Sequence, residues 1–279
     1  MALFRYTWRT FSRELTLVFG AALIFIPLYF LITLSLKSPQ DIFSDPLTFP
    51  TDPELSNFSE AWEGSGSISL ARALFNSAVI TLFSVAGLIA IGSLCAYTIA
   101  RRPSRLSSLT YYMFVLAIIL PFQLAIVPLF VAMREIGLVP SYLGMILLNI
   151  GLFMPLTVFL YTGFVRVLPR DYEEAAQVDG ASMLRTFVRV VFPLLRPVTA
   201  TVAVLTGVLT WNEFFVPLIF LSGSDYQTLP VAVYSFVGEY VTKFNFIFAA
   251  VVIAIAPVLL FYLFAQRQLI RGFSGGIRG

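Results

Sequence analysis

The sequence predicts an all-α integral membrane protein with six transmembrane helices, and its composition and the lengths of its apolar runs support this prediction. Of the 279 residues, 58% are hydrophobic and 12% are charged, whereas soluble domains have about 45–50% and about 25%. Six runs reach the length of about 20 residues that a helix needs to cross a bilayer. Because unpaired backbone groups are costly in hydrocarbon, such long runs favour helices over barrel strands.

The predicted spans follow one another in a single transmembrane domain, residues 1–279. They cover 15–36, 75–100, 107–133, 141–165, 198–221 and 244–266. The first run is longer than the apolar core of a secretory signal, about 7–15 residues, and lacks a small-x-small cleavage site, so we expect it to be retained. Prolines inside the spans are expected to kink their helices, because each frees a backbone carbonyl. These prolines are Pro27, Pro121, Pro128, Pro155, Pro217 and Pro257.

The distribution of basic residues predicts the orientation of the spans. Of the 18 Lys and Arg residues, all but four fall on the side of the membrane that holds both termini. The four exceptions are Lys37, Arg72, Arg134 and Lys243. The positive-inside rule therefore places both termini in the cytoplasm and predicts a multi-pass membrane protein.

Residues that are missing or rare exclude several classes of chemistry. The chain has no histidine and a single cysteine, Cys95, which excludes zinc sites, His-based catalytic triads and disulfide frameworks within it. Neither Lys37 nor Lys243 follows a glycine-rich loop, so the chain has no Walker-type loop for nucleotide phosphates. We therefore expect no enzymatic activity, metal or cofactor in this chain, and any ATP that drives it must bind to another chain. The basic residues flank apolar runs, which argues against nucleic acid as a partner.

The cytoplasmic connection 168–196, between the fourth and fifth spans, is too long to lack structure of its own in a compact bundle. Asp171 can begin a helix, and Glu173 and Glu174 then lie in the first turn, where the helix dipole favours anions. We expect this first short helix to run from Tyr172 to Val178. The Asp-Gly pair that follows should interrupt it.

A second helix is expected after this interruption, from Ala181 to Val191. Its apolar residues fall near helical spacing, and Pro193 and Pro197 are expected to end it. The sequence thus predicts a cytoplasmic helix-loop-helix whose small residues leave one side without bulk, so that a partner surface can come close. The alternative is an amphipathic element that only anchors the connection at the membrane face.

Two short motifs in this connection carry a resemblance to a known family. Glu174-Ala175-Ala176 is followed by Asp179-Gly180-Ala181 and then by Pro193, and this pattern resembles the EAA signature of the permease subunits of binding-protein-dependent ABC importers. Phe192 stands where many members carry leucine, a departure that leaves the helix-loop-helix expectation intact. Further matches resemble the carbohydrate branch, maltose-transporter type, over nearly the whole chain. They are Ser35-Leu36-Lys37, Trp211-Asn212-Glu213-Phe214, Thr228-Leu229-Pro230 and Gln266-Arg267 through Arg278-Gly279.

The resemblance implies a transport function and a set of partners. It implies that the chain forms half of the translocation pathway for a sugar or oligosaccharide in the cytoplasmic (inner) membrane of a prokaryote. Besides membrane lipid, the expected partners are a second homologous permease subunit, two ATPase subunits that bind ATP and Mg, and an extracytoplasmic sugar-binding protein. Whether the second half is a different chain or a second copy stays open.

The resemblance also gives the helix-loop-helix a coupling role, because in the family this element docks in a cleft of the ATPase subunit. The residues carried over are Glu174, Ala175, Ala176, Asp179, Gly180 and Ala181. Since the chain has no nucleotide site of its own, energy must enter mechanically through such a rigid element. A bulky residue at Gly180 is expected to uncouple transport, either by a clash with the partner or by strain if Gly180 has a positive φ.

Glu213 is the only acidic residue inside a predicted span, and a carboxylate there costs about 2.5–3.5 kcal/mol on insertion scales and suggests function or a polar cavity. Together with Trp211, Asn212 and Phe214, it is a candidate for the wall of the solute route. A sugar needs polar partners for its hydroxyls and flat apolar faces for its rings. The alternative is a structural hydrogen bond from Glu213 to a neighbouring helix.

On the outer side, the long connection after the fifth span is rich in aromatic residues. By resemblance it faces the binding protein, with Gly238, Glu239 and Tyr240 as the contact residues. Tyrosines that merely sit at the membrane interface are the alternative.

Two other functions stay open from the sequence. The first is a permease of the same mechanism for a non-sugar solute such as glycerol phosphate or an amino acid; phosphate recognition would favour an arginine in the pathway, and no predicted span contains one. The second is an ATP-independent carrier or channel. A proton-coupled carrier would bury ionisable groups within its spans, and only Glu213 lies there.

Overall fold

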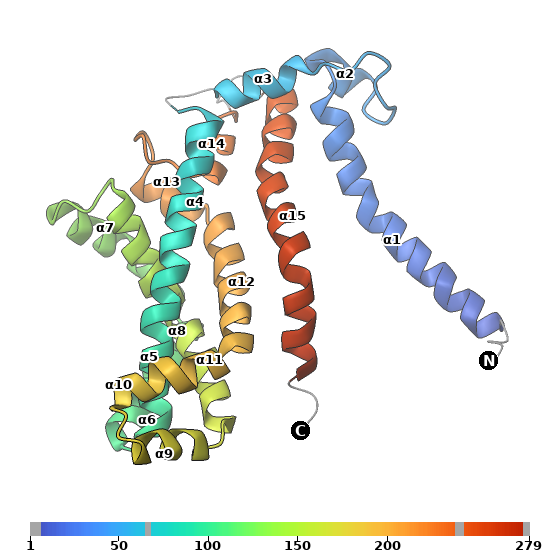
Figure 1. Cartoon of the computed structure of the whole chain (residues 1–279). Helices are drawn as coiled ribbons and strands as arrows, with labels where there is room; N and C mark the ends of the chain where they lie inside the picture. The colour runs from blue at the N-terminus through green and yellow to red at the C-terminus, as the bar shows by residue number, and fades with distance from the viewer. Residues whose placement is uncertain (1–6, 65–67, 238–242, 276–279) are drawn as a thin grey trace. The chain divides into compact units, whose positions relative to one another are not determined.

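The computed structural model describes residues 7–64, 68–237 and 243–275, and it contains helices but no strand in these ranges (Figure 1). The all-α prediction is thus confirmed. The chain divides into two compact units, unit 1 with Met1–Ala71 and Ala232–Ala256, and unit 2 with Arg72–Val231 and Pro257–Gly279.

Unit 1 contains three complete helices, and most of the others lie in unit 2. The helices of unit 1 are α1 (Trp8–Ser35), α2 (Pro39–Ser44) and α3 (Ser56–Glu63). Next come α4 (Leu70–Gly87), η1 (Leu88–Gly92), α5 (Ser93–Arg101), α6 (Arg105–Ile119), η2 (Phe122–Ala125), α7 (Ile126–Glu135) and α8 (Tyr142–Val167). After these follow α9 (Asp171–Val178), α10 (Met183–Thr186), η3 (Phe187–Val191), α11 (Phe192–Leu194), α12 (Arg196–Asn212) and α13 (Phe215–Phe220). The division between the units falls within α4, after its second residue, and within α14 (Leu229–Tyr234) and α15 (Phe244–Gly275).

Three helices of the described residues are long and apolar enough to cross a membrane, namely Thr10–Ser35, Leu70–Arg101 and Tyr142–Val167. Two further helix pairs pass the same test together but are bent, Arg105–Ile119 with Phe122–Glu135 by 95° and Met183–Leu194 with Arg196–Asn212 by 77°. The apolar stretch Phe244–Leu260 of α15 is shorter. Up to five spans are therefore found if each bent pair is one span, and the count of six stays a prediction.

Prolines break two of the predicted spans where we expected only kinks. Within 107–133, Leu120 is extended (φ −70°, ψ 131°) because the residue before a proline is kept out of the helical region. Within 198–221, α12 ends at Asn212 and Glu213 is extended (φ −65°, ψ 123°). Pro217 lacks the N–H that would bond to the Glu213 carbonyl, and its ring would clash with that carbonyl in a helix. The continuous helices expected for these two runs are thus wrong.

Within unit 2, the continuous segment α4–η1–α5 packs closely against α8. A Cβ atom added to Gly87 would lie 2.4 Å from the Ile150 side chain, and one added to Gly92 would lie 2.5 Å from the Thr157 side chain. Small residues at such contacts let helix backbones approach each other. Below this contact, Tyr97 and Tyr161 are fully buried in a core that includes Val191 of η3.

In unit 1, the buried side chain of Asn57 on α3 joins three segments. Its amide nitrogen donates to the carbonyls of Ser35 (3.1 Å) and Lys37 (3.0 Å) at the end of α1. Its oxygen accepts from the amide of Asn245 (2.8 Å) in the first turn of α15. These hydrogen bonds satisfy buried polar groups that would otherwise bond to water.

Candidate functional site

The connection 168–196 forms the predicted helix-loop-helix, with one correction at its second helix. The first helix, α9, begins at Asp171, one residue before the predicted start. The second begins at Met183, where the Ser182 hydroxyl accepts from the Arg185 N–H (3.4 Å), and runs through η3 and α11 to Leu194. The expectation that Pro193 ends it is wrong, because Pro193 directly follows the π-helical turn η3 and the helical backbone continues through it to Leu194.

The corner between the two helices has a defined hydrogen-bond pattern. The Ala181 N–H donates to the Ala176 carbonyl (3.0 Å) and the Gly180 N–H donates to the Gln177 carbonyl (2.9 Å). These two bonds, with Gly180 at φ +80°, are the Schellman motif that closes helix C-termini. The spacing between Ala176 and Ala181 thus has a structural reason, since these two residues bond to each other across the Gly180 turn.

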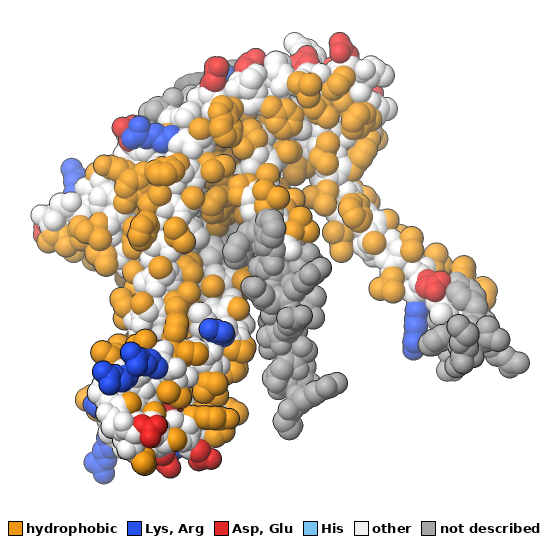
Figure 2. Space-filling view, viewed as in Figure 1, with side chains coloured by type: hydrophobic (Ala, Val, Ile, Leu, Met, Phe, Trp, Pro, Cys, Tyr) orange, Lys and Arg blue, Asp and Glu red, His pale blue; other side chains and the backbone are white. Residues whose placement is uncertain are grey.

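The six residues predicted to couple lie on an open surface of unit 2. Glu174, Ala175, Asp179 and Gly180 are exposed, and Ala176 and Ala181 are half-buried. A Cβ atom added to Gly180 would meet nothing within 4 Å. Within this chain, a side chain at Gly180 would therefore cause strain through its positive φ and no clash. In the space-filling view, charged side chains gather at the end of unit 2 that carries α9 and α10 (Figure 2).

Glu173, the neighbour of Glu174, is held by two residues that the sequence analysis did not single out. Its carboxylate accepts from the Tyr97 hydroxyl (2.9 Å) and from Arg101 Nε and Nη2 (both 2.7 Å). Arg101 Nη2 also donates to the Leu168 carbonyl (3.0 Å) at the end of α8. The sequence showed Arg101 only as one of several orienting charges, because pairing across 72 residues leaves no local pattern.

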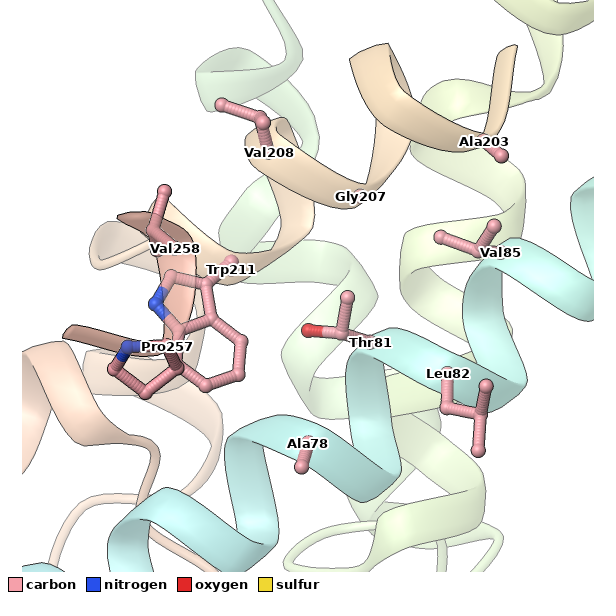
Figure 3. Close-up of a pocket in the computed structure, with 10 residues that line it drawn as sticks. All are labelled: Ala78, Thr81, Leu82, Val85, Ala203, Gly207, Val208, Trp211, Pro257 and Val258. Atoms are coloured by element: carbon pink, nitrogen blue, oxygen red, sulfur yellow. The ribbon is translucent and has the colours of Figure 1, made fainter. Parts of the chain in front are cut away.

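A pocket of about 510 Å³ lies in unit 2 and contains one of the predicted pathway residues, Trp211. Figure 3 shows its walls, which come from α4, α12 and the part of α15 in unit 2. The lining residues are Ala78, Thr81, Leu82, Val85, Ala203, Gly207, Val208, Trp211, Pro257 and Val258. The walls are almost wholly apolar, and the indole ring of Trp211 forms part of them (Figure 3).

The other predicted pathway residues lie at the break after α12. The exposed Asn212 donates to the Val208 carbonyl of its own helix (2.9 Å), and Phe214 is half-buried. Glu213 accepts from the N–H of Val216 (3.1 Å) and so caps the first turn of α13. This structural hydrogen bond is made to the following helix, whereas the sequence analysis considered a neighbouring one.

We expect Glu213→Ala to lower the free energy of unfolding by about 1 kcal/mol, because the Val216 N–H loses its acceptor. Glu213→Gln keeps an oxygen in the same place and should change that free energy by less than about 0.5 kcal/mol. Thermal unfolding of the purified protein in detergent measures both. An equal loss with both variants would contradict the cap and point to the charge itself.

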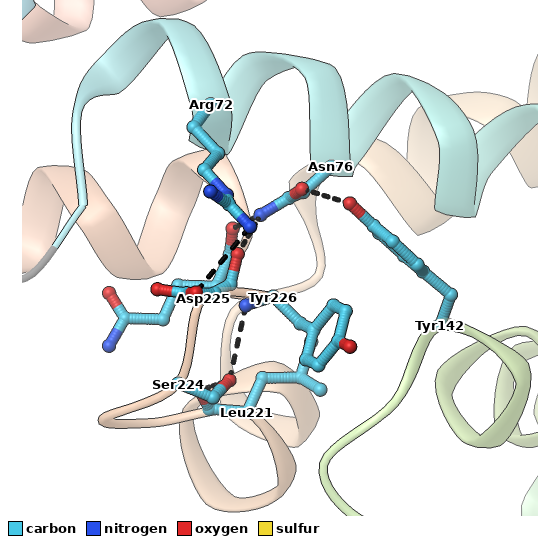
Figure 4. Close-up of polar contacts among 8 residues, drawn as sticks. Arg72, Asn76, Tyr142, Leu221, Ser224, Asp225 and Tyr226 are labelled. Atoms are coloured by element: carbon cyan, nitrogen blue, oxygen red, sulfur yellow. Dashed lines mark hydrogen bonds and ion pairs between the residues drawn. The ribbon is translucent and has the colours of Figure 1, made fainter.

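A polar network fixes the segment after α13 to the start of α4 (Figure 4). The fully buried Asn76 donates to the carbonyls of Asp225 (2.9 Å) and Gln227 (2.8 Å), and its oxygen accepts from the Tyr142 hydroxyl. Beside it, the guanidinium of Arg72 lies 3.5 Å from the Asp225 carboxylate. The segment is thereby ordered up to α14.

Among the described residues, no group of three or more Cys, Asp or Glu side chains could hold a metal ion. The predicted contact residues Gly238, Glu239 and Tyr240 lie outside the described residues.

Comparison with known proteins places the chain in a family. Residues 88–275 match the model of the binding-protein-dependent transport system inner membrane component. The chain belongs to this family. As such a component, it is a multi-pass inner membrane protein of a transport system that works with a binding protein.

Individual relatives of this inner membrane component cover almost its whole length. The melibiose/raffinose/stachyose import permease protein MelC of Bacillus subtilis is 40% identical over 253 residues, which are 90% of each chain. The multiple sugar-binding transport system permease protein MsmG of Streptococcus mutans is 33% identical over 95% of this chain and 96% of its own. A bacterial ABC transporter involved in import of the polysaccharide alginate has a chain of the same fold, with a TM-score of 0.79 at 20% identity, covering 96% of this chain and 99% of that one.

Proposed function

We propose that this chain forms one half of the translocation pathway of an ATP-driven importer for a sugar or oligosaccharide. A second homologous permease subunit supplies the other half, two ATPase subunits supply the energy, and an extracytoplasmic binding protein delivers the solute. The chain spans the membrane six times as one domain, residues 1–279, with both termini in the cytoplasm. It carries no cofactor and no catalytic residue, and ATP and Mg bind to the ATPase subunits.

The open corner at Gly180 carries the proposal that force enters from a partner. Of the side chains in α9, only that of Glu173 is buried, so the rest of this helix is available to another protein. Tyr172 and Val178 are 55% and 87% exposed, and such apolar groups on a rigid helix suit a cleft in a partner. Glu174, Ala175, Ala176, Asp179, Gly180 and Ala181 form the coupling surface.

The class of solute rests on the relatives and on the pocket at Trp211. Both MelC and MsmG are named for sugars, which favours a sugar over glycerol phosphate or an amino acid. Trp211 offers a flat face of the kind on which sugar rings stack, and Asn212 offers an amide beside it. We assign Trp211, Asn212, Glu213 and Phe214 to the solute route, and Gly238, Glu239 and Tyr240 to the contact with the binding protein.

Purification of the tagged chain from its host membrane tests the proposal. We expect an ATPase and a second permease subunit to co-purify, and proteoliposomes of the complex to import labelled raffinose only when ATP and the binding protein are present. Glu174→Ala should lower the amount of bound ATPase at least about tenfold, since it removes a charge at the centre of the docking surface. Asp171→Ala, at another exposed acidic residue at the start of α9, is the matched control and should leave binding unchanged. Uptake by the chain alone would overturn the proposal in favour of an ATP-independent carrier or channel.

A further inference from the structure

The first helix of the connection, α9, is attached to the rest of unit 2 in an unusual way. Its single buried residue is Glu173, whose side chain carries a carboxylate. The large apolar side chains of α9 face outward instead, with Tyr172 at 55% and Val178 at 87% exposure. A short helix normally packs through apolar residues. Here a charged side chain holds α9 against the rest of unit 2 instead.

Arg101 is the centre of this attachment and touches three segments at once. It ends α5, its Nε and Nη2 atoms donate to Glu173 of α9, and Nη2 also donates to the Leu168 carbonyl after α8. The second carboxylate oxygen of Glu173 accepts from Tyr97, one turn earlier on α5. Both oxygens are thus bonded, and the side chains of Arg101 and Glu173 are each 9% exposed.

We propose that the Arg101–Glu173 pair, completed by Tyr97, is the joint that passes the movement of α9 on to α5. This inference rests on the proposed function, in which a partner moves α9. The two residues are positioning residues: they contact neither the solute nor the partner's nucleotide.

Neither end of α9 continues directly into a neighbouring helix, so a side-chain contact is needed to carry its movement to α5. Before α9, Leu168 is extended, and after it Gly180 adopts a conformation open to few other residues. Apolar surfaces that touch can transmit a push, but they separate when pulled. A buried ion pair with several hydrogen bonds also resists separation, so α5 follows α9 in both directions of a transport cycle.

A continuous helical segment connects Arg101 to the pocket that contains Trp211. From α5 the chain runs without interruption through η1 into α4, which contributes Thr81 and Val85 to the pocket wall. η1 is a π-helical turn, a feature that occurs often at functional sites. A displacement of Arg101 along α5 therefore reaches the pocket through one continuous helical segment.

Replacing both members of the pair by methionine tests whether the pair transmits movement or only stabilises the fold. An apolar pair of similar volume commonly preserves folding where a single change does not. We therefore expect Arg101→Met with Glu173→Met to assemble and hydrolyse ATP in proteoliposomes, but to import at least about tenfold fewer solute molecules per ATP hydrolysed. Glu173→Gln, which keeps the shape and removes the charge, should lower the same ratio.

The outcomes decide clearly between the possibilities. If the double variant assembles and its number of solute molecules imported per ATP stays within about twofold of wild type, the proposed joint is wrong. If the double variant does not assemble, an unchanged ratio in Glu173→Gln would also show that it is wrong. Arg105→Met removes an exposed arginine four residues further on and should leave the ratio unchanged. If the wild-type complex neither hydrolyses ATP nor imports solute, the proposed function itself fails, and this result is distinct from a changed ratio in a working complex.

Discussion

Gly180→Val is expected to abolish most ATP-driven uptake while the chain still inserts into the membrane. Gly180 has φ +80°, and the Schellman bonds of the corner need this conformation. A β-branched residue there costs about 1–3 kcal/mol, so the corner rearranges and α9 and α10 change their relative direction. The coupling surface then no longer fits its partner. Uptake by proteoliposomes and the amount of co-purified ATPase measure the effect.

Gly137 provides the matched control for this substitution. It also has a positive φ, +73°, and a Cβ atom added to it would likewise meet nothing within 4 Å. Gly137→Val thus introduces comparable strain in a loop far along the chain from the corner, and uptake should fall less than about twofold. Gly180→Asn should retain most uptake, because asparagine tolerates positive φ better than valine. Equal losses in Gly137→Val and Gly180→Val would show that strain alone, anywhere in the chain, explains the defect.

The corner illustrates what the sequence could predict. An acidic first turn, an Asp-Gly pair and small residues at fixed spacing are all local signals, so α9 and its end at Gly180 were correctly placed to within a residue. The sequence did not predict which face of α9 is buried. Neighbouring carboxylates at Glu173 and Glu174 look alike in the sequence, and only the distant Arg101 decides which of them is buried.

The breaks in two spans show a second limit. Hydropathy gives the length of an apolar run, but it does not show whether a proline bends the helix or ends it. Pro155 lies inside α8 and Pro257 inside α15, whereas Pro121 and Pro217 stand at breaks. At Pro217 a second feature favours the break, because the side chain of Glu213 is available to cap the new helix. Such compensation depends on geometry around the proline, which no sequence window contains.

Asn76→Leu is expected to destabilise the protein more than any other change considered, with a loss of about 3–5 kcal/mol in the free energy of unfolding. Asn76 is fully buried and bonds to two backbone carbonyls and to the Tyr142 hydroxyl. Leucine has the same branching at Cγ but bonds to none of them, and each buried polar group left without a partner costs about 1–3 kcal/mol. Thermal unfolding in detergent should show the loss directly.

Two control variants distinguish the effect of losing the hydrogen-bond network from the effect of changing an asparagine to leucine. Tyr142→Phe removes one bond and leaves both carbonyls paired, so it should cost only about 1 kcal/mol. Asn212→Leu makes the same chemical change at an exposed asparagine that bonds only to its own helix, and should cost less than about 0.5 kcal/mol. Because the carbonyls belong to residues 225 and 227, the loss at Asn76 should also make the segment after α13 sensitive to proteases. A stable Asn76→Leu variant with that segment still protected would mean that other contacts, such as the Leu229 N–H bond to Ser77 (2.8 Å), suffice to hold it.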